Sequence, residues 1–227
     1  MLASNVMTKA GVQLLDEDHV RWTLPDLATY ITEAVSAIIS VKPSARTVSV
    51  TVDLVAGTRQ QLPDDQRIVQ LIDIPCNMSA GVRGRSIRSV ARAELDSNEP
   101  RWHEATVVPF RKEVRNFMFD EITPTLFWVY PGNDGTGAVE AFVSQLPPPV
   151  ETLVEEDDNT SEIETWEVSV GLADHYEPAV LEYVLYRCFS KEELAGSGQK
   201  AVAHYQAFAT LIGLKSQVER DNSPRRS

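Results

Sequence analysis

The apolar residues of this chain change their spacing twice, and these changes constrain the fold more than any other feature. Residues 1–42 and 172–213 place apolar side chains at the intervals of amphipathic helices, whereas the region between them contains strand-like runs. In the first block, Thr23 and Asp26 resemble a capping box, and Pro43 follows the apolar stripe. The sequence therefore predicts a helix that begins near residue 24 and ends near residue 41.

The middle of the chain contains short β-branched runs that glycine and proline residues separate. Many short strands between turns are typical of an antiparallel sandwich or a small barrel. Strands do not alternate with helices here, so a parallel sheet is not expected. The predicted strands lie at residues 47–55, 68–74, 86–91, 106–108, 117–119, 126–130 and 138–145.

These patterns predict an α+β fold, in which two helical blocks that can form one bundle flank an antiparallel β domain, and an extended tail ends the chain. Gly213 is expected to stop the last helix, since glycine is the usual residue just past a helix end. The predicted limits are 1–45 and 172–213 for the bundle, 46–171 for the β domain with an acidic loop, and 214–227 for the tail.

Residues 174–189 are apolar on too many sides for a helix on the surface of a monomer. Tyr176, Val180 and Val184 lie on one side of the predicted helix, and Leu181 and Leu185 lie on another. A helix that is apolar all round has to be covered all round. The rest of the bundle covers one side in this interpretation, and a neighbouring subunit is a candidate for the other.

Charge is distributed unevenly along a chain whose net charge is −12. This sign disfavours general binding to nucleic acids and docking on an anionic membrane. Residues 151–167 hold eight acidic side chains and no basic one, whereas residues 83–115 are rich in arginine. The two segments are complementary, and they are expected to meet within one chain or between neighbouring chains. The candidate subunit contacts are Arg83, Arg85 and Arg88 on one side and Glu155, Glu156 and Asp157 on the other.

The last residues of the chain, 214–227, have almost no apolar content. They are interpreted as a disordered tail or as an arm that becomes ordered on a partner. The candidate partner-binding cations of this tail are Lys215, Arg220, Arg225 and Arg226.

Signatures of catalysis are missing from the sequence. The four histidines show no metal-ligand spacing, and the glycine-containing segment at residues 195–200 lacks the spacing of a phosphate-binding loop. Cys76 and Cys188 are expected to be buried free thiols. We therefore expect no catalytic residues, no metal, no cofactor and no enzyme activity. A signal peptide and a membrane span are not expected either.

Several phrases of the sequence occur in the same order in one known family. They are Val20-Arg21-Trp22, Gly57-Thr58-Arg59-Gln60-Gln61-Leu62-Pro63, Leu95-Asp96 before Pro100-Arg101-Trp102, Asp120 with Pro124, Phe127 and Tyr130-Pro131, Tyr183-Val184-Leu185-Tyr186-Arg187, and His204-Tyr205 with Phe208. In this order they resemble the head-to-tail adaptor (connector) proteins of short-tailed bacteriophages. The resemblance covers roughly residues 5–213.

The resemblance implies a structural protein of the virion that forms a homo-oligomeric ring, usually of twelve copies. The ring would lie beneath the portal protein and above the tail nozzle protein, in the neck of the phage, after assembly in the host cytoplasm. Genomic DNA would pass through its centre without sequence-specific binding, and no membrane would be involved. The resemblance also implies the fold, a discontinuous helical bundle of about four helices with an inserted antiparallel β domain and an extended C-terminal tail. Members of the family tend to hold the portal with such a C-terminal extension.

Two other functions remain open at this point. The first is another interaction module, such as a tail-completion or baseplate-type protein, which would stay low in oligomeric order and ignore the portal. The second is an enzyme of unknown type, which would contain a pocket with strongly perturbed titrating groups.

Overall fold

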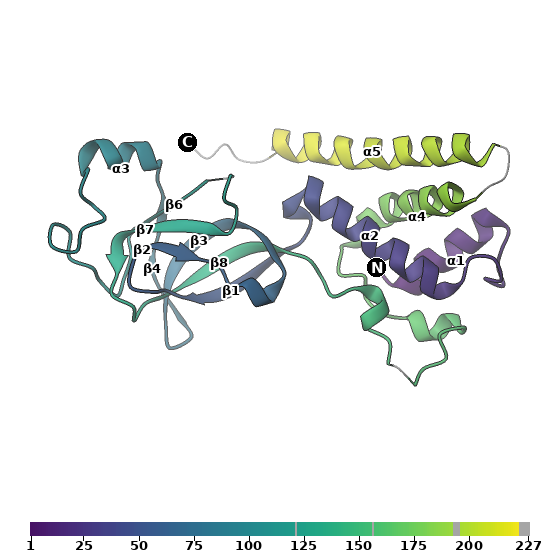
Figure 1. The fold of residues 1–227 in the computed structure, drawn as a ribbon, viewed down its shortest axis with the longest axis horizontal. Helices are drawn as coiled ribbons and strands as arrows, with labels where there is room; N and C mark the ends of the chain where they lie inside the picture. The colour runs from purple at the N-terminus through teal and green to yellow at the C-terminus, as the bar shows by residue number, and fades with distance from the viewer. Residues whose placement is uncertain (121, 156, 193–195, 223–227) are drawn as a thin grey trace. The chain divides into compact units, whose positions relative to one another are not determined.

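The protein is described by a computed structural model of residues 1–120, 122–155, 157–192 and 196–222, with the backbone alone for residues 65 and 214–222 (Figure 1). The predicted α+β class is confirmed. The α-helices are α1 (Ala3–Leu14), α2 (Leu24–Val41), α3 (Arg92–Asn98), α4 (Glu177–Lys191) and α5 (Ser197–Asn222). The strands are β1 (Thr47–Asp53), β2 (Gly57–Gln61), β3 (Ile68–Ser79), β4 (Val82–Ser86), β5 (Arg88–Ser89), β6 (Asn116–Phe119), β7 (Leu126–Asn133) and β8 (Ala138–Gln145).

The chain folds into two compact units. The helical unit comprises Met1–Ala45 and Pro147–Ser227, and the β unit comprises Arg46–Leu146. The β unit is thus inserted into the helical unit, and its two ends are hydrogen-bonded to each other. Gln145 donates its backbone N–H to the carbonyl oxygen of Arg46 at 3.4 Å, and the Arg46 guanidinium donates to the carbonyl oxygen of Gln145 at 3.1 Å.

Helix α4 packs against other helices of the same chain on two sides. Its residues Val184, Leu185 and Cys188 are fully buried, and it contacts α1, α2 and α5. On the α5 side, the ring of Tyr183 lies 5.0 Å from that of Phe208, centroid to centroid. On the side that the sequence interpretation offered to a neighbouring subunit, Leu185 is already buried within the chain and Leu181 is half-buried. The arrangement of the helices as a single four-helix bundle stays a prediction.

Helix α2 begins and is buried as the sequence pattern predicts. The Thr23 hydroxyl accepts a hydrogen bond from the Asp26 backbone N–H at 3.3 Å and caps the helix. By length and composition alone, α2 also meets the criteria for a membrane-spanning helix. Half of its apolar window is buried inside the protein, including Leu27, Ile31 and Ile38, and the core helix of a folded domain shows the same pattern.

The acidic segment belongs to the helical unit, which corrects its predicted grouping with the β domain. Ala3 donates its backbone N–H to the carbonyl oxygen of Val168 at 2.9 Å, and Val170 donates to Met1 at 3.1 Å. Trp166, which is 2% exposed, lies in a short 3₁₀ helix that contacts α1. The N-terminus therefore fixes residues 166–170 against the helices, a long-range pairing that periodicity cannot show.

Helix α5 does not end at Gly213 as predicted, since its backbone continues to Asn222. The prediction of an extended tail is therefore wrong for residues 214–222, and residues 223–227 lie outside the described part of the chain. A single glycine weakens a helix by only about 1 kcal/mol. Lys215 and Gln217 favour helix, and no proline follows until Pro224.

The β unit consists of two four-stranded sheets around one core. The strand orders are β1-β8-β3-β4 and β2-β7-β6-β5, and every pair is antiparallel except β5 with β6. Strand β1 pairs with β8 in continuous register from Thr47 opposite Ser144 to Asp53 opposite Ala138. Both sheets contribute buried side chains to the core, among them Leu71 and Val143 from the first and Phe117 and Phe127 from the second. The predicted antiparallel character is confirmed.

Three details of the β unit differ from the predicted strands. Residues 106–108, predicted as a strand, lie in a turn and a bend instead. All three are exposed or half-buried. Residues 86–91 divide between the end of β4 and the short β5, because Ile87 is buried between them and donates its backbone N–H to Pro75. Residues 57–61 form β2, which was not among the predicted strands, and Gly57 begins it with a φ of +125°.

Candidate assembly surfaces

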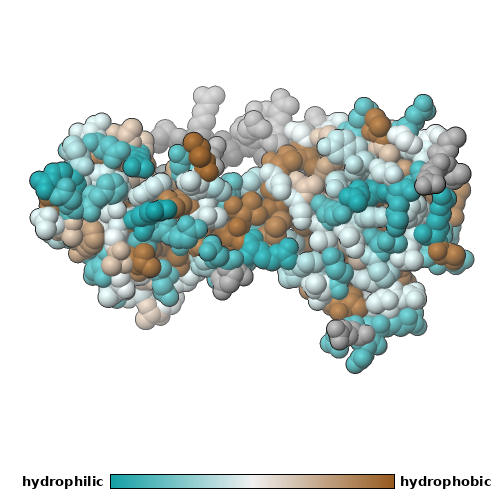
Figure 2. All heavy atoms as spheres, in the orientation of Figure 1, coloured by the Kyte–Doolittle hydropathy of each residue, from teal (hydrophilic) through white to brown (hydrophobic). Residues whose placement is uncertain are grey.

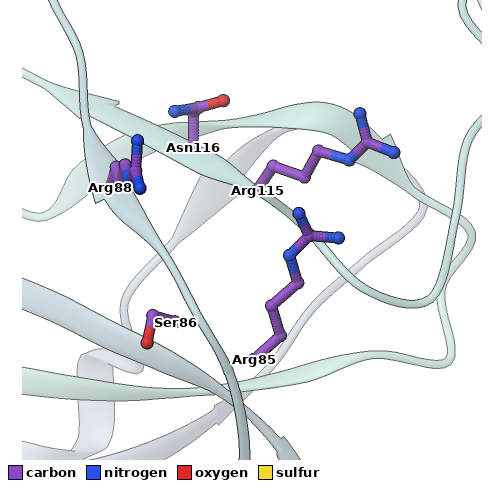
Figure 3. A pocket seen from close by; sticks show the side chains of 5 residues that line it. All are labelled: Arg85, Ser86, Arg88, Arg115 and Asn116. Carbon is purple, nitrogen blue, oxygen red and sulfur yellow. The ribbon is translucent and has the colours of Figure 1, made fainter.

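Three arginine side chains surround a pocket in the β unit (Figure 3). Arg85 comes from β4, Arg88 from β5, and Arg115 from the residue before β6. Ser86 and Asn116 complete the lining of the pocket, whose volume is about 420 Å³. We call this feature the arginine pocket.

The arginine pocket lies where the edges of the two sheets come together. Strand β4 is the outer strand of the first sheet, and β5 is the outer strand of the second. Arg88 donates its backbone N–H to the carbonyl oxygen of Arg115 at 3.1 Å, which joins two sides of the pocket. An edge strand has backbone groups that no neighbour pairs, so this region of the β unit is available for contacts.

Asn77, a buried residue of β3, connects the backbone segments that carry the arginines. Its amide nitrogen donates to the carbonyl oxygens of Arg85 at 3.0 Å and Val114 at 2.8 Å. Its amide oxygen accepts the backbone N–H of Val114 at 2.8 Å. Asn77 is therefore a positioning residue for Arg85 and Arg115. Sequence reasoning missed it, because a polar residue in a strand ordinarily faces water.

The charge of the arginine pocket is not neutralised within the described part of the chain. Arg85, Arg88 and Arg115 are exposed, no carboxylate lines the pocket, and none of the three forms an ion pair with another described residue. Guanidinium groups bind carboxylates and phosphates through paired hydrogen bonds. The pocket is therefore suited to an anionic group.

Arg83, the other arginine predicted for this contact, has a different role. It lies in β4 but forms an ion pair at 2.6 Å with Glu140 of β8. Glu140 is 6% exposed and also accepts hydrogen bonds from Ser49 of β1 at 2.7 Å and from Cys76 of β3 at 3.5 Å. The hydrogen bond from Arg83 lowers the pKa of Glu140 below its ordinary value. Of the three predicted arginines, Arg85 and Arg88 line the pocket and Arg83 does not. The third arginine of the pocket is Arg115.

The acidic segment, residues 151–167, exposes most of its carboxylates. Glu155 and Asp157 are exposed, and Glu156 lies outside the described residues. No acidic residue of the segment forms an ion pair with another residue that the structure describes. Figure 2 shows hydrophilic groups along the outer edge of this loop. The acidic segment belongs to the helical unit and the arginine pocket to the β unit, so they are separate surfaces.

The predicted C-terminal cations fall partly within α5. Lys215 and Arg220 lie on the helical backbone of α5, and Arg225 and Arg226 lie outside the described residues. The structure therefore describes the backbone beneath two of the four predicted portal contacts.

A groove between α4 and α5 is lined mostly by apolar side chains. Its volume is about 400 Å³, and its lining includes Tyr186, Phe189, Val202 and Tyr205. Val202 is 57% exposed and Tyr205 is 48% exposed. Exposed aromatic and aliphatic groups of this kind are common in protein contacts.

The described residues offer little for catalysis. Among them, no group of three or more histidine, cysteine, aspartate or glutamate side chains could hold a metal ion. Burial raises the pKa of the Cys188 thiol to about 12, which keeps it protonated, and burial also raises the pKa of Cys76. The Nδ1 atom of His204 in α5 lies 2.7 Å from the Oε2 atom of Glu182 in α4, and this contact joins the two helices.

An exposed arginine pocket, an exposed acidic segment and an apolar groove on one chain are typical of a component of an assembly. Residues 1–227 match the family model described as SU10 adaptor protein. The chain therefore belongs to the SU10 adaptor protein family, a family of phage head-tail adaptors, and the predicted resemblance is confirmed. It is a structural component of a bacteriophage virion that associates with other head or tail proteins. No curated protein matches the chain.

Proposed function

We propose that this protein forms a homo-oligomeric ring that joins the portal protein to the tail nozzle protein and forms part of the channel for genomic DNA. The observation that carries this proposal is the match to an adaptor family over residues 1–227. The expected number of copies is twelve, as the resemblance implies. The protein acts as a structural connector in the neck of the virion rather than as an enzyme, and it assembles in the host cytoplasm.

A closed ring requires two different faces on every subunit, because each copy contacts its two neighbours through unlike surfaces. The chain has surfaces of unlike chemistry in its arginine pocket, its acidic segment and its α4–α5 groove. Because these surfaces differ in chemistry, one of them can contact a different one on the next copy, as a ring requires.

The net charge of −12 suits a channel through which DNA moves without being held. Acidic side chains repel the phosphates of the DNA over a distance of about 8 Å at physiological salt. The cations that would contact the portal are confined to the end of the chain, at Lys215, Arg220, Arg225 and Arg226.

The proposal is tested by the mass of the purified protein, measured by light scattering with and without purified portal protein. A species of about twelve copies, alone or on the portal, is the expected result. A protein that stays monomeric or dimeric and ignores the portal would overturn the proposal in favour of another tail-completion module.

A further inference from the structure

We infer that the arginine pocket binds the acidic segment of a second copy of this chain. The inference deepens the proposed function, and it rests on that function in taking the occupant from a neighbouring copy. It assigns one pair of unlike faces to the contact between subunits.

The donors of the pocket favour a carboxylate-rich occupant. Arg85, Arg88 and Arg115 each present a fork of N–H donors, and Asn116 and Ser86 add an amide and a hydroxyl (Figure 3). A pocket of about 420 Å³ is large enough for several carboxylate side chains. The exposed arginines gain paired hydrogen bonds only when such an occupant enters.

The acidic segment supplies the matching charges. Glu155, Asp157 and Asp158 are consecutive or nearly consecutive exposed acids in a stretch that holds no basic residue. Trp166 is buried in a short 3₁₀ helix that contacts α1, which fixes the end of the segment on the helical unit. Within the segment, its indole N–H is donated to the Thr160 carbonyl oxygen at 3.1 Å. A loop that is fixed in this way loses less conformational entropy on binding than a free tail does.

The competing anion is the phosphate backbone of DNA, and the charge of the chain argues against it. Each copy carries twelve more acidic than basic side chains, so long-range repulsion opposes a DNA polyanion. A second copy carries the same net charge and has to be held at the pocket by the other contacts of the ring. An acidic segment that belongs to a neighbouring subunit also competes at high effective concentration. We therefore assign the pocket to the protein contact.

Disulfide trapping between full-length chains tests the assignment. One chain carries Arg115→Cys, a second chain with a different tag carries Asp157→Cys, and the mixture is oxidised under non-reducing conditions. We expect a cross-linked product that contains both tags and that diminishes by at least about tenfold when salt is raised from low to high concentration. The native Cys76 and Cys188 are buried and give a common background.

The matched control is Arg59→Cys, which places the thiol at an exposed position of β2 outside the pocket. An equal yield from residues 59 and 115 would show that the trapping is random and would overturn the inference. A single chain with both Arg115→Cys and Asp157→Cys that closes only within itself, while the mixture gives no product, would assign the contact to one chain instead.

Charge reversal separates the nucleic-acid alternative. The variant Arg85→Glu, Arg88→Glu, Arg115→Glu is expected to lose the association between copies while Arg59→Glu keeps it. If the triple variant instead loses binding to a duplex oligonucleotide and associates normally, DNA is the occupant and the inference fails. A ring on the portal without the 115–157 cross-link would overturn the pocket assignment alone and would leave the proposed function in place.

Discussion

Glu140 is the residue on which four strands of one sheet converge. From β8 it accepts hydrogen bonds from Arg83 of β4, Ser49 of β1 and Cys76 of β3. We expect Glu140→Gln to destabilise the β unit by about 1–3 kcal/mol, because the amide keeps the shape but gives up the charge that Arg83 pairs with. Urea unfolding measures this change, and Glu113→Gln, an exposed residue of the same unit, provides the control.

The same carboxylate makes the stability of the β unit depend on pH. The hydrogen bond from Arg83 lowers the pKa of Glu140 in the folded protein below the ordinary value of 4.5. The stabilisation is therefore fully present above pH 4.5 and is lost as the pH falls through the folded pKa. In Glu140→Gln this part of the acid dependence should vanish, and an unchanged acid branch would contradict the assigned ion pair.

At the scale of single residues, the sequence shows which segments are rich in charge, but it does not show which charged side chains meet in the fold. It singled out Arg85 and Arg88 as contact residues, and the structure brings both into one pocket. It could not show that Arg83 is paired with Glu140, since the two lie 57 residues apart and meet only through sheet pairing. The sequence also could not show that Arg115 lines the pocket, because Arg115 meets Arg88 only through the pairing of β5 with the chain before β6.

At the scale of elements, the continuation of α5 through Gly213 gives a direct test of the helix. Nothing lies within 4 Å of a Cβ built at Gly213, and the residue is exposed. We expect Gly213→Ala to stabilise the helix by about 0.5–1 kcal/mol and to slow amide hydrogen exchange at residues 214–222. Gly213→Pro should have the opposite effect. If residues 214–222 exchange equally fast in the wild type and in both variants, the prediction of an extended tail would stand instead of the helix.

Removal of residues 214–227 tests the role of the same element in assembly. We expect the truncated protein to keep its fold, since α4 packs against the part of α5 that contains the buried Ala201, Phe208 and Ile212. Its affinity for purified portal should fall, because Lys215, Arg220, Arg225 and Arg226 are lost. A pull-down titration measures the change, and docking as tight as that of the full chain would contradict the assignment.

Trp166 provides a test of how the acidic segment is attached. Its buried indole joins the segment to the helical unit, and Trp166→Ala removes this anchor at a cost of about 3–5 kcal/mol. We expect a Glu-specific protease to cut the segment faster in this variant, while cleavage after the exposed Glu17 stays unchanged. Trp166→Phe keeps most of the packing and should resemble the wild type.

The elements that could be predicted are those with a strong local signal. Helix α2 has both a cap and an apolar stripe, and β1 alternates between exposed and more buried side chains along its length, so both lie within a few residues of their predicted limits. Residues 166–170 were grouped with the wrong unit because their partners are Met1 and Ala3, far away in sequence. The end of α5 was misplaced because one glycine was given more weight than the helix-forming residues after it.

At the scale of the whole molecule, the insertion predicts that the β unit folds alone. Residues 46–146 contain both sheets and their common core, and Arg46 is hydrogen-bonded to Gln145 at the ends. We expect this fragment to unfold cooperatively in urea, and Phe127→Ala to lower its stability by about 3–5 kcal/mol. A fragment without cooperative unfolding would show that the β unit depends on the helices.

The adjacent ends of the β unit also have a consequence for how phage genes change. A single uninterrupted block of codons, 46–146, encodes a structure whose two ends are hydrogen-bonded to each other. Recombination at the two borders of this block can exchange the whole cassette while the codons for the helices stay untouched. A lineage can then acquire a new arginine pocket without losing the C-terminal helix, so the two surfaces are free to diversify at different rates.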